Sequence, residues 1–317
     1  MLFRPYGSTN ISLSVIGLGG HEYLPNGSSR GFNEHRSEAV KPGYTGEGYG
    51  GPQRRAVLET ALENGVNFFD VTIDPEKEAL GRNLREVTVP HDIYIQTRPE
   101  GMGYGYDPGN RKMADGKRLR SEVERCLTLL QRDTIDILNF PFLQSALDED
   151  PDYLDKIAAN IRDLKESGLI RFASVDNFSG ESTYLTQIES GIFDSISINF
   201  NFADTSAETK VFPAARIAGM GILTREVFQK GKLFVMGEEA GIDDRSQLAR
   251  IAIKWNLSSP QVTTALVGAE NPDQFLNAVA ILEDPALGSE ETAILERLLA
   301  TVSGADFQRT KRNAFLG

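Results

Sequence analysis

Cysteine and histidine are scarce in this sequence, and their scarcity excludes two ways of stabilising a fold. Cys126 is the single cysteine among 317 residues, so the chain cannot form a disulfide within itself. One cysteine and three histidines also argue against a structural zinc site, which needs four such ligands close together. We therefore expect neither disulfides nor a metal site.

Positive charge is also in short supply. The chain has 33 Lys and Arg residues against 45 Asp and Glu residues, a formal net charge of −12. Nucleic acids and anionic membranes attract basic surfaces, so neither is an expected partner. No apolar run approaches the ~20 residues of a membrane span, and the first residues lack the apolar core of a signal peptide. These absences favour a cytoplasmic protein and leave its oligomeric state open.

The sequence does contain a repeated alternation of strand and helix patterns. Short apolar runs predict eight strands that begin near Val15, Asn67, Ile93, Ile135, Ile170, Ser195, Gly221 and Thr263. Nearly all are followed by a helical pattern, and eight right-handed βα units close into a (β/α)8 TIM barrel, an α/β fold. A doubly wound sheet is the alternative, but nothing marks a second domain or a reversal of strand order. We predict one barrel domain over residues 1–317.

Loops and turns add detail to this barrel. A turn at residues 7–10 joins two short strands, which predicts an N-terminal β-hairpin. Residues 21–52 are rich in Gly, Ser, Pro and Tyr, and a loop this long in a compact domain is usually functional or disordered. We expect an ordered lid over the C-terminal face of the barrel. A second Gly-rich loop is predicted for residues 100–115, and Ser179 or Ser182 is predicted to cap the helix that ends at Glu189.

Polar side chains recur where the apolar strands end. In VNFFDV, residues 66–71, a buried strand delivers one carboxylate, Asp70, which either caps the next turn or belongs to a site. The C-terminal strand ends of a TIM barrel form its active face. The polar residues at the eight predicted ends include His21, Glu22, Asp70, Arg98, Asn139, Asp176, Asn177, Asn199, Asn201, Arg225 and Glu226. We predict a site at this face and an ion pair between Asp70 and Arg98.

Several motifs then carry a resemblance to a known family. They are ALENGVNFFD (61–70), EALGRNL (78–84), TIDILNF (134–140), SGLIRFASVDNF (167–178) and LVGAENPDQF (266–275). In this order along the chain, the motifs resemble the aldo-keto reductases nearly from end to end. The resemblance implies a TIM barrel that reduces carbonyl groups with NADPH, using a tetrad of Asp, Tyr, Lys and His.

The tetrad itself is mostly replaced in this sequence. Asp70 matches the family Asp, but the segment after it, DVTIDPEKE, contains no Tyr. Arg98 stands at the position of the Lys, and no His lies near Pro141, where the family has one. His21 at the first strand end and Tyr44 in the long loop, with Tyr49 as an alternative, are candidates to replace the lost groups. We name Asp70, Arg98, His21 and Tyr44 as catalytic candidates.

The family's cofactor pocket is altered as well. Asp176 and Asn177 correspond to the Ser-Asn pair that holds the nicotinamide carboxamide, Ser197 to a Gln, and Arg225 to the aromatic that stacks on the nicotinamide. Asn271 corresponds to an Arg that grips the 2′-phosphate of NADP(H), whereas Gln274 fits the pattern well. The full set of cofactor-binding candidates is Asp176, Asn177, Ser197, Arg225, Gly231, Gly268, Asn271 and Gln274.

Three functions remain open from the sequence. The first is an NADP(H)-linked oxidoreductase that acts on a carbonyl or alcohol group of a small polar, sugar-like substrate through a rebuilt proton relay. The second is a lyase, dehydratase or epimerase on the same barrel, with carboxylates such as Asp70 as acids and bases. The third is a binding protein that has lost catalysis.

Overall fold

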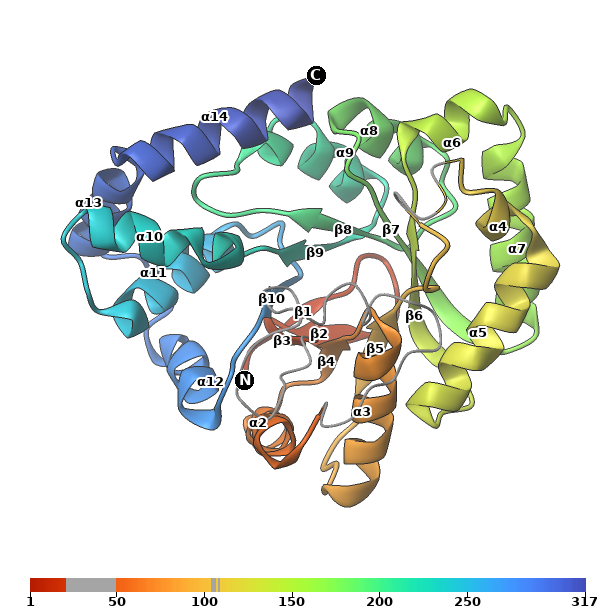
Figure 1. Cartoon of the computed structure of the whole chain (residues 1–317), viewed down its shortest axis with the longest axis horizontal. Helices are drawn as coiled ribbons and strands as arrows, with labels where there is room; N and C mark the ends of the chain where they lie inside the picture. The colour runs from red at the N-terminus through yellow and green to blue at the C-terminus, as the bar shows by residue number, and fades with distance from the viewer. Residues whose placement is uncertain (21–49, 104–106, 108) are drawn as a thin grey trace.

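The computed structural model describes residues 1–20, 50–103, 107 and 109–317. Eight parallel strands in this part of the chain close into a barrel, in the order β10-β3-β4-β5-β6-β7-β8-β9. The strands are β3 (Ile16–Gly19), β4 (Phe68–Asp70), β5 (Tyr94–Thr97), β6 (Ile135–Pro141), β7 (Ile170–Asp176), β8 (Ser195–Asn199), β9 (Gly221–Arg225) and β10 (Thr264–Val267). The predicted (β/α)8 TIM barrel is confirmed, and Figure 1 shows its helices arranged around the strands.

An antiparallel hairpin, β1 (Phe3–Pro5) and β2 (Ser12–Ser14), precedes the barrel, as predicted. Gly7 in its turn has φ +57°, and a Cβ there would lie 2.3 Å from the Gly219 carbonyl oxygen, so the position requires glycine. Tyr6 and Leu13 of the hairpin join the apolar cluster inside the barrel, and the Tyr6 hydroxyl hydrogen-bonds the Ser195 hydroxyl at 2.7 Å. The hairpin therefore closes the end of the barrel at which the strands begin.

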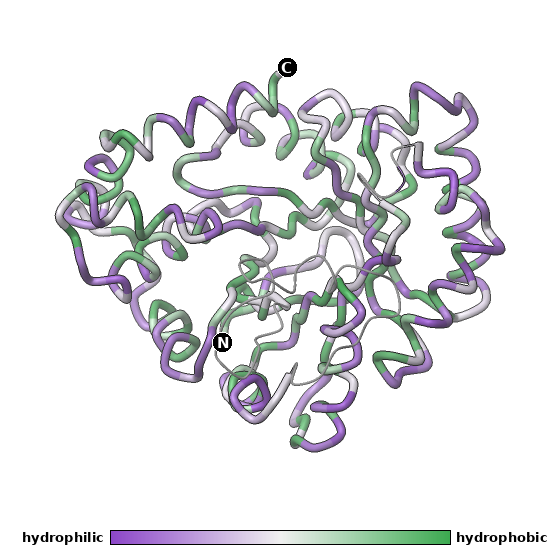
Figure 2. Tube along the Cα trace, in the orientation of Figure 1, coloured by the Kyte–Doolittle hydropathy of each residue, from purple (hydrophilic) through white to green (hydrophobic). Residues whose placement is uncertain are grey.

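Helices form the outer layer. They are α2 (Pro52–Glu63), α3 (Asp74–Glu86), α4 (Arg111–Ala114), α5 (Gly116–Leu130), α6 (Gln144–Glu149), α7 (Tyr153–Glu166), α8 (Glu181–Glu189), α9 (Val211–Ile217), α10 (Lys232–Glu239), α11 (Arg245–Ser258), α12 (Pro272–Val279), α13 (Ser289–Leu299) and α14 (Val302–Leu316), with 3-10 turns η3 (Ser206–Glu208), η4 (Gln229–Gly231) and η5 (Ala280–Glu283). Hydrophilic and hydrophobic stretches alternate along the outer helices in Figure 2 because their apolar faces cover the barrel.

Several local predictions need correction. The loop predicted for residues 100–115 contains α4, and α10 and α14 were not predicted at all. Neither Ser179 nor Ser182 caps α8, whose N-cap is Gly180, because the Ser179 hydroxyl accepts the Gln144 backbone N–H at 2.9 Å instead. The predicted lid over residues 21–52 lies outside the described residues except at its end, where Pro52 already opens α2. Proline suits that first helical position because a backbone N–H there would have no partner within the helix, and proline has none.

Strand alternation decides which side chains point into the barrel. The inner apolar cluster contains Phe68 of β4, Ile137 of β6 and Leu223 of β9. Two residues further along the same strands, the inward positions are Asp70, Asn139 and Arg225. The barrel interior is thus apolar at the earlier strand positions and polar at the end where the strands finish. That end is the active face of this fold.

Candidate functional site at the barrel mouth

Asp70 ends β4 at the barrel mouth and is half-buried. Its pKa is raised to about 6, chiefly by burial and also by the nearby charge of Glu76. A hydrogen bond of 2.8 Å from Gln96 Nε2 to Asp70 Oδ1, together with the charges of Arg98 and Arg225, opposes that rise. The carboxyl group can therefore both donate and accept a proton near neutral pH, as a general acid–base group must.

Gln96 links Asp70 to the opposite side of the barrel. Its Oε1 accepts a hydrogen bond from the Ser197 hydroxyl at 3.3 Å, and that hydroxyl lies 3.2 Å from the Ser174 hydroxyl. All three side chains are buried. This chain of hydrogen bonds fixes the Gln96 amide so that its N–H faces Asp70. Gln96 was not predicted as a site residue, although its place two residues before Arg98 puts it on the same inward face.

The ion pair at the mouth lies elsewhere than predicted. Gln96, rather than Arg98, contacts the Asp70 carboxylate among the described residues, and Arg98 acts on Asp70 through its charge. Instead, both terminal nitrogens of Arg225 donate to the carboxylate of Asp176, whose side chain is 0% exposed. The two strands β7 and β9 are not neighbours, so strand-end positions in the sequence did not indicate this pair.

The Asp176–Arg225 pair is part of a closed network. Arg225 Nε donates to Asn199 Oδ1 at 2.8 Å, and its guanidinium lies 4.9 Å from the centre of the Phe178 ring. All three guanidinium nitrogens are therefore engaged by neighbouring side chains. The network ties together the ends of β7, β8 and β9, and buried charges of this kind need such full pairing.

Asn177 is committed to local structure. Its Oδ1 accepts the backbone N–H groups of Ser179 and Gly180 at 2.9 and 3.1 Å. Its Nδ2 donates to Gln187 Oε1 at 2.8 Å, and the residue is 3% exposed. The amide that the family resemblance assigned to a cofactor thus shapes the turn into α8.

The described residues leave a pocket of about 30 Å³ beside Asp70. Glu76 and Arg54 also line it, and it lies between the first two barrel strands and helices α2 and α3. Arg54 donates to the backbone oxygens of Gly19 and Ala269 at 2.9 and 3.3 Å, so its charge is fixed at the rim. A cavity of this size holds a water molecule or two.

The loop between β9 and α10 has an unusual backbone. Glu226, Gln229 and Lys230 have φ values of +58°, +54° and +55°, which non-glycine residues adopt at a cost. Gln229 is 1% exposed, and within the described part of the chain neither polar atom of its side chain has a hydrogen-bond partner. Gly231 follows with φ +89° and caps α10. Strain and an unpartnered buried amide in one loop are features of a ligand-binding segment.

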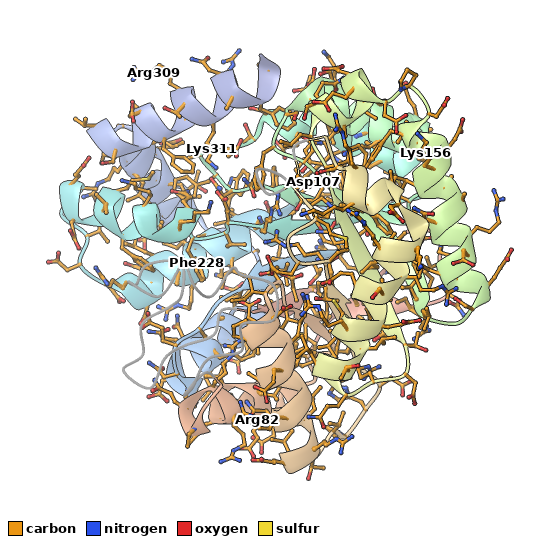
Figure 3. The ribbon with its side chains drawn as sticks, turned by 45° about the vertical axis from the view of Figure 1, so that its right-hand side comes forward. Arg82, Asp107, Lys156, Phe228, Arg309 and Lys311 are labelled. Carbon is orange, nitrogen blue, oxygen red and sulfur yellow. The ribbon has the colours of Figure 1, made fainter. Side chains whose placement is uncertain are left out.

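The C-terminal helix reaches this same loop. Lys311 of α14 donates to Glu226 Oε2 at 2.8 Å. Burial and the charge of Glu226 raise the pKa of Asp204 nearby. In Figure 3, Lys311 lies below α14 toward the body of the protein, whereas Arg309 points away above it. The helix α14 therefore holds the loop after β9 from outside.

The remaining cofactor-binding candidates lie around the start of α12. Asn271 caps this helix, with its Oδ1 accepting the Gln274 backbone N–H at 3.0 Å. Gln274 Oε1 in turn accepts the Glu270 backbone N–H at 2.8 Å. Gly268 directly follows β10 and is partly exposed at the mouth.

A buried charge cluster between α3 and α5 was not predicted. Lys77 is 0% exposed and donates to Asp74 Oδ1 at 3.1 Å, and Arg125 also pairs with Asp74. Arg125 further donates to Glu122 at 2.9 Å. Burial lowers the pKa of Lys77, but the nearby Cys126 and the acidic groups raise it more strongly, so the ammonium stays charged. The cluster joins helices α3 and α5.

His21 and Tyr44, two of the predicted catalytic residues, lie outside the described residues. Within the part of the chain that the structure describes, no group of three or more His, Cys, Asp or Glu side chains is placed to hold a metal ion. No helix in that same part is long and apolar enough to cross a membrane.

Barrel, hairpin and mouth together define the architecture of an aldo-keto reductase, and comparison with known proteins agrees. A family model described as the Aldo/keto reductase family matches residues 43–243, which is more than half of the chain. The chain belongs to this family and is an oxidoreductase of its type. Its fold is similar to that of aldo-keto reductase AKR11C1 from Bacillus halodurans (holo form), with 20% identity, a TM-score of 0.68, and coverage of 94% of this chain and 96% of that one.

The family generally uses a nicotinamide cofactor. In this chain, only part of the expected pocket has residues that are free to contact such a cofactor. The loop after β9 offers the unpartnered Gln229 amide and the glycine at 231. By contrast, Asp176 and Arg225 bond to each other, and the oxygen and the nitrogen of the Asn177 amide both bond to neighbouring protein groups. The positions that would contact the nicotinamide in the family pattern therefore do not offer those contacts here.

Proposed function

We propose that this protein is an oxidoreductase that acts on a carbonyl or alcohol group of a small polar, sugar-like substrate, with Asp70 as the group that gives or takes the substrate proton. The observation that carries the proposal is the position of Asp70 at the barrel mouth together with its pKa of about 6. A general acid–base group works best when its pKa lies near the working pH.

Asp70 would transfer the proton from a fixed position. Gln96 holds one carboxylate oxygen at 2.8 Å, and the carboxyl group lies beside the pocket that Glu76 also lines. Arg98 is a permanent cation at the next strand end, since the pKa of a guanidinium stays above ~12. It would stabilise negative charge on the substrate oxygen without itself exchanging a proton.

NADP(H) remains our proposed cofactor, and it would supply or accept the hydride. The loop of residues 226–231, with Gly268, Asn271 and Gln274 near the start of α12, would hold its phosphate end. We assign no contact to its nicotinamide end, because Asp176 and Arg225 are bonded to each other and the Asn177 amide is bonded to Gln187 and to the turn before α8. His21 and Tyr44 remain proposed members of the proton relay.

Titration of the full-length protein with NADPH, followed by the fluorescence of bound NADPH, tests this function. We expect saturable binding, and NADPH oxidation when small hydroxylated aldehydes and ketones are added as a panel. Failure to bind NADPH at millimolar concentration would exclude the redox function.

One observation favours a second candidate, a non-redox lyase, dehydratase or epimerase. The Asp176–Arg225–Asn199 network closes the half of the mouth where the family binds nicotinamide, while the Asp70 half keeps an acid–base group. Substrate-dependent product formation in the absence of any nicotinamide cofactor would support this candidate. A binding protein without catalysis would show neither activity.

A further inference from the structure

Asn139 is the inward-facing residue near the end of β6, in the same polar layer as Asp70 and Arg225. Ile137, two residues earlier, belongs to the apolar cluster inside the barrel, so alternation along the strand turns Asn139 into the mouth. The residue is 5% exposed. A buried amide in this position must be explained by its hydrogen bonds.

Those bonds are largely missing. Asn139 Oδ1 is buried and has no hydrogen-bond partner among the described residues. Its Nδ2 makes one long contact of 3.5 Å with Asp176 Oδ2, an oxygen that already receives the stronger bond from Arg225. Rotating the amide by half a turn would bring its oxygen against the Asp176 carboxylate, so the orientation is fixed. Turning the amide therefore does not give the unpartnered oxygen a hydrogen-bond donor within the barrel.

A buried polar atom without a partner costs free energy, and an apolar side chain of the same shape would avoid this cost. Such positions persist where a ligand completes the bonding. An amide offers one acceptor and two donor hydrogens side by side, which matches a hydroxyl group next to a carbonyl oxygen.

Resting on the function proposed above, we propose that Asn139 contacts the substrate, with Oδ1 accepting a hydrogen bond from a substrate hydroxyl and Nδ2 donating to the neighbouring oxygen at the reacting carbon. The substrate is accordingly an α-hydroxy aldehyde or ketone, or the corresponding diol. Simple alkyl carbonyls would leave the Asn139 oxygen unpartnered and bind less well, because a site built to bond a hydroxyl rejects the analogue that lacks it.

The test compares two small probes that differ in this hydroxyl, hydroxyacetone and 2-butanone. Their binding to the full-length protein is measured by ligand-observed NMR titration, without cofactor. We expect wild type to bind hydroxyacetone at least about tenfold more tightly than 2-butanone. Asn139→Leu, close in shape but without polar atoms, should remove this preference without lowering the melting temperature. Asn139→Ala serves as a second variant if the leucine packs poorly.

Thr97→Val is the matched control. The Thr97 hydroxyl is also buried and unpartnered at the same end of the barrel, but alternation after Gln96 turns it outward toward the helices. This variant should keep the preference for hydroxyacetone. Wild type with no preference, or an Asn139→Leu variant that retains it, would overturn the inference.

The outcomes separate this inference from the proposed function. A wild type that prefers hydroxyacetone through Asn139 but never oxidises NADPH with such compounds leaves the inference standing and removes the redox function. Conversely, a wild type that reduces 2-butanone and hydroxyacetone equally well, unaffected by Asn139→Leu, keeps the redox function and removes the inference.

Discussion

The two halves of the barrel mouth solve the problem of buried charge in opposite ways. At the ends of β7, β8 and β9, Asp176 is fully buried and bonded to Arg225, whose remaining nitrogen is bonded to Asn199. At the ends of β4 and β5, Asp70 has one hydrogen-bond partner among the described residues, the Gln96 amide, and its pKa is raised to about 6. One half is closed and structural, and the other keeps a carboxyl group that titrates near pH 6.

This comparison indicates where chemistry and where stability reside in the mouth. A fully paired buried ion pair has no free proton to exchange and no open oxygen for a substrate. A carboxyl group that is held at one oxygen, with burial opposing its charge, can still exchange a proton and still has an oxygen open to a substrate.

The first prediction concerns catalysis by the open half. Asp70→Asn should lower kcat/KM by about 10²–10⁴-fold, because the amide cannot exchange a proton while its oxygen can still accept from Gln96. The measurement is steady-state NADPH oxidation with the best substrate of the carbonyl panel. The control is Asp92→Asn, an exposed residue just before β5, at the end of the barrel opposite Asp70. Activity within twofold of wild type in Asp70→Asn would remove Asp70 from the mechanism.

The second prediction concerns stability in the closed half. Arg225→Ala should lower the free energy of unfolding by about 3–5 kcal/mol, because it leaves the fully buried Asp176 carboxylate without its counter-charge. Urea denaturation gives the value. Arg82→Ala, which breaks an exposed pair with Glu78 on α3 (Figure 3), should cost no more than about 0.5 kcal/mol. Equal losses in the two variants would contradict a structural role for the buried pair.

The third prediction uses pH to separate the two halves. Because the folded protein raises the pKa of Asp70 from 3.8 to about 6, the native state binds its proton more tightly than the unfolded chain does. Ionised Asp70 therefore destabilises the fold above about pH 6, and this penalty disappears as the pH falls to 3.8.

Asp70→Asn should consequently be more stable than wild type at pH 8, by at most about 3 kcal/mol, with the difference shrinking toward pH 4. Asp204, whose pKa burial also raises to about 6, titrates in both proteins and cancels from the comparison. Urea denaturation at several pH values gives the difference. A constant difference across this range would show that Asp70 does not titrate as described.

The fourth prediction asks whether the closed half is what prevents the family's cofactor contacts. The double variant Asp176→Ser and Arg225→Tyr restores the family residue types and removes both charges together, so that neither is left unpaired. We expect it to bind NADPH about tenfold more tightly than wild type, a gain of about 1.4 kcal/mol. Fluorescence titration gives both dissociation constants, and unchanged affinity would mean that the nicotinamide contacts are made elsewhere.

Much of this architecture was predictable from the sequence because it depends on local patterns. Apolar runs followed by helical periodicity indicated the eight barrel strands, and the glycine turn at residues 7–10 indicated the hairpin. Helices with weaker local signals, such as α10 and α14, were missed. The cap of α8 was assigned wrongly because Ser179 is recruited by Gln144, which lies 35 residues earlier.

The sequence by itself also determined that polar residues gather at one face of a TIM barrel and that Asp70 stands among them. Only the tertiary structure decided which of these residues bond to each other. Asp176 and Arg225 are 49 residues apart, and Gln96 and Ser197 are 101 residues apart. Their contacts depend on the register and stagger of strands around a closed barrel, which no local pattern encodes. Packing across the mouth thus left Asp70 able to titrate, paired Asp176 with Arg225, and kept the Asn139 oxygen without a partner.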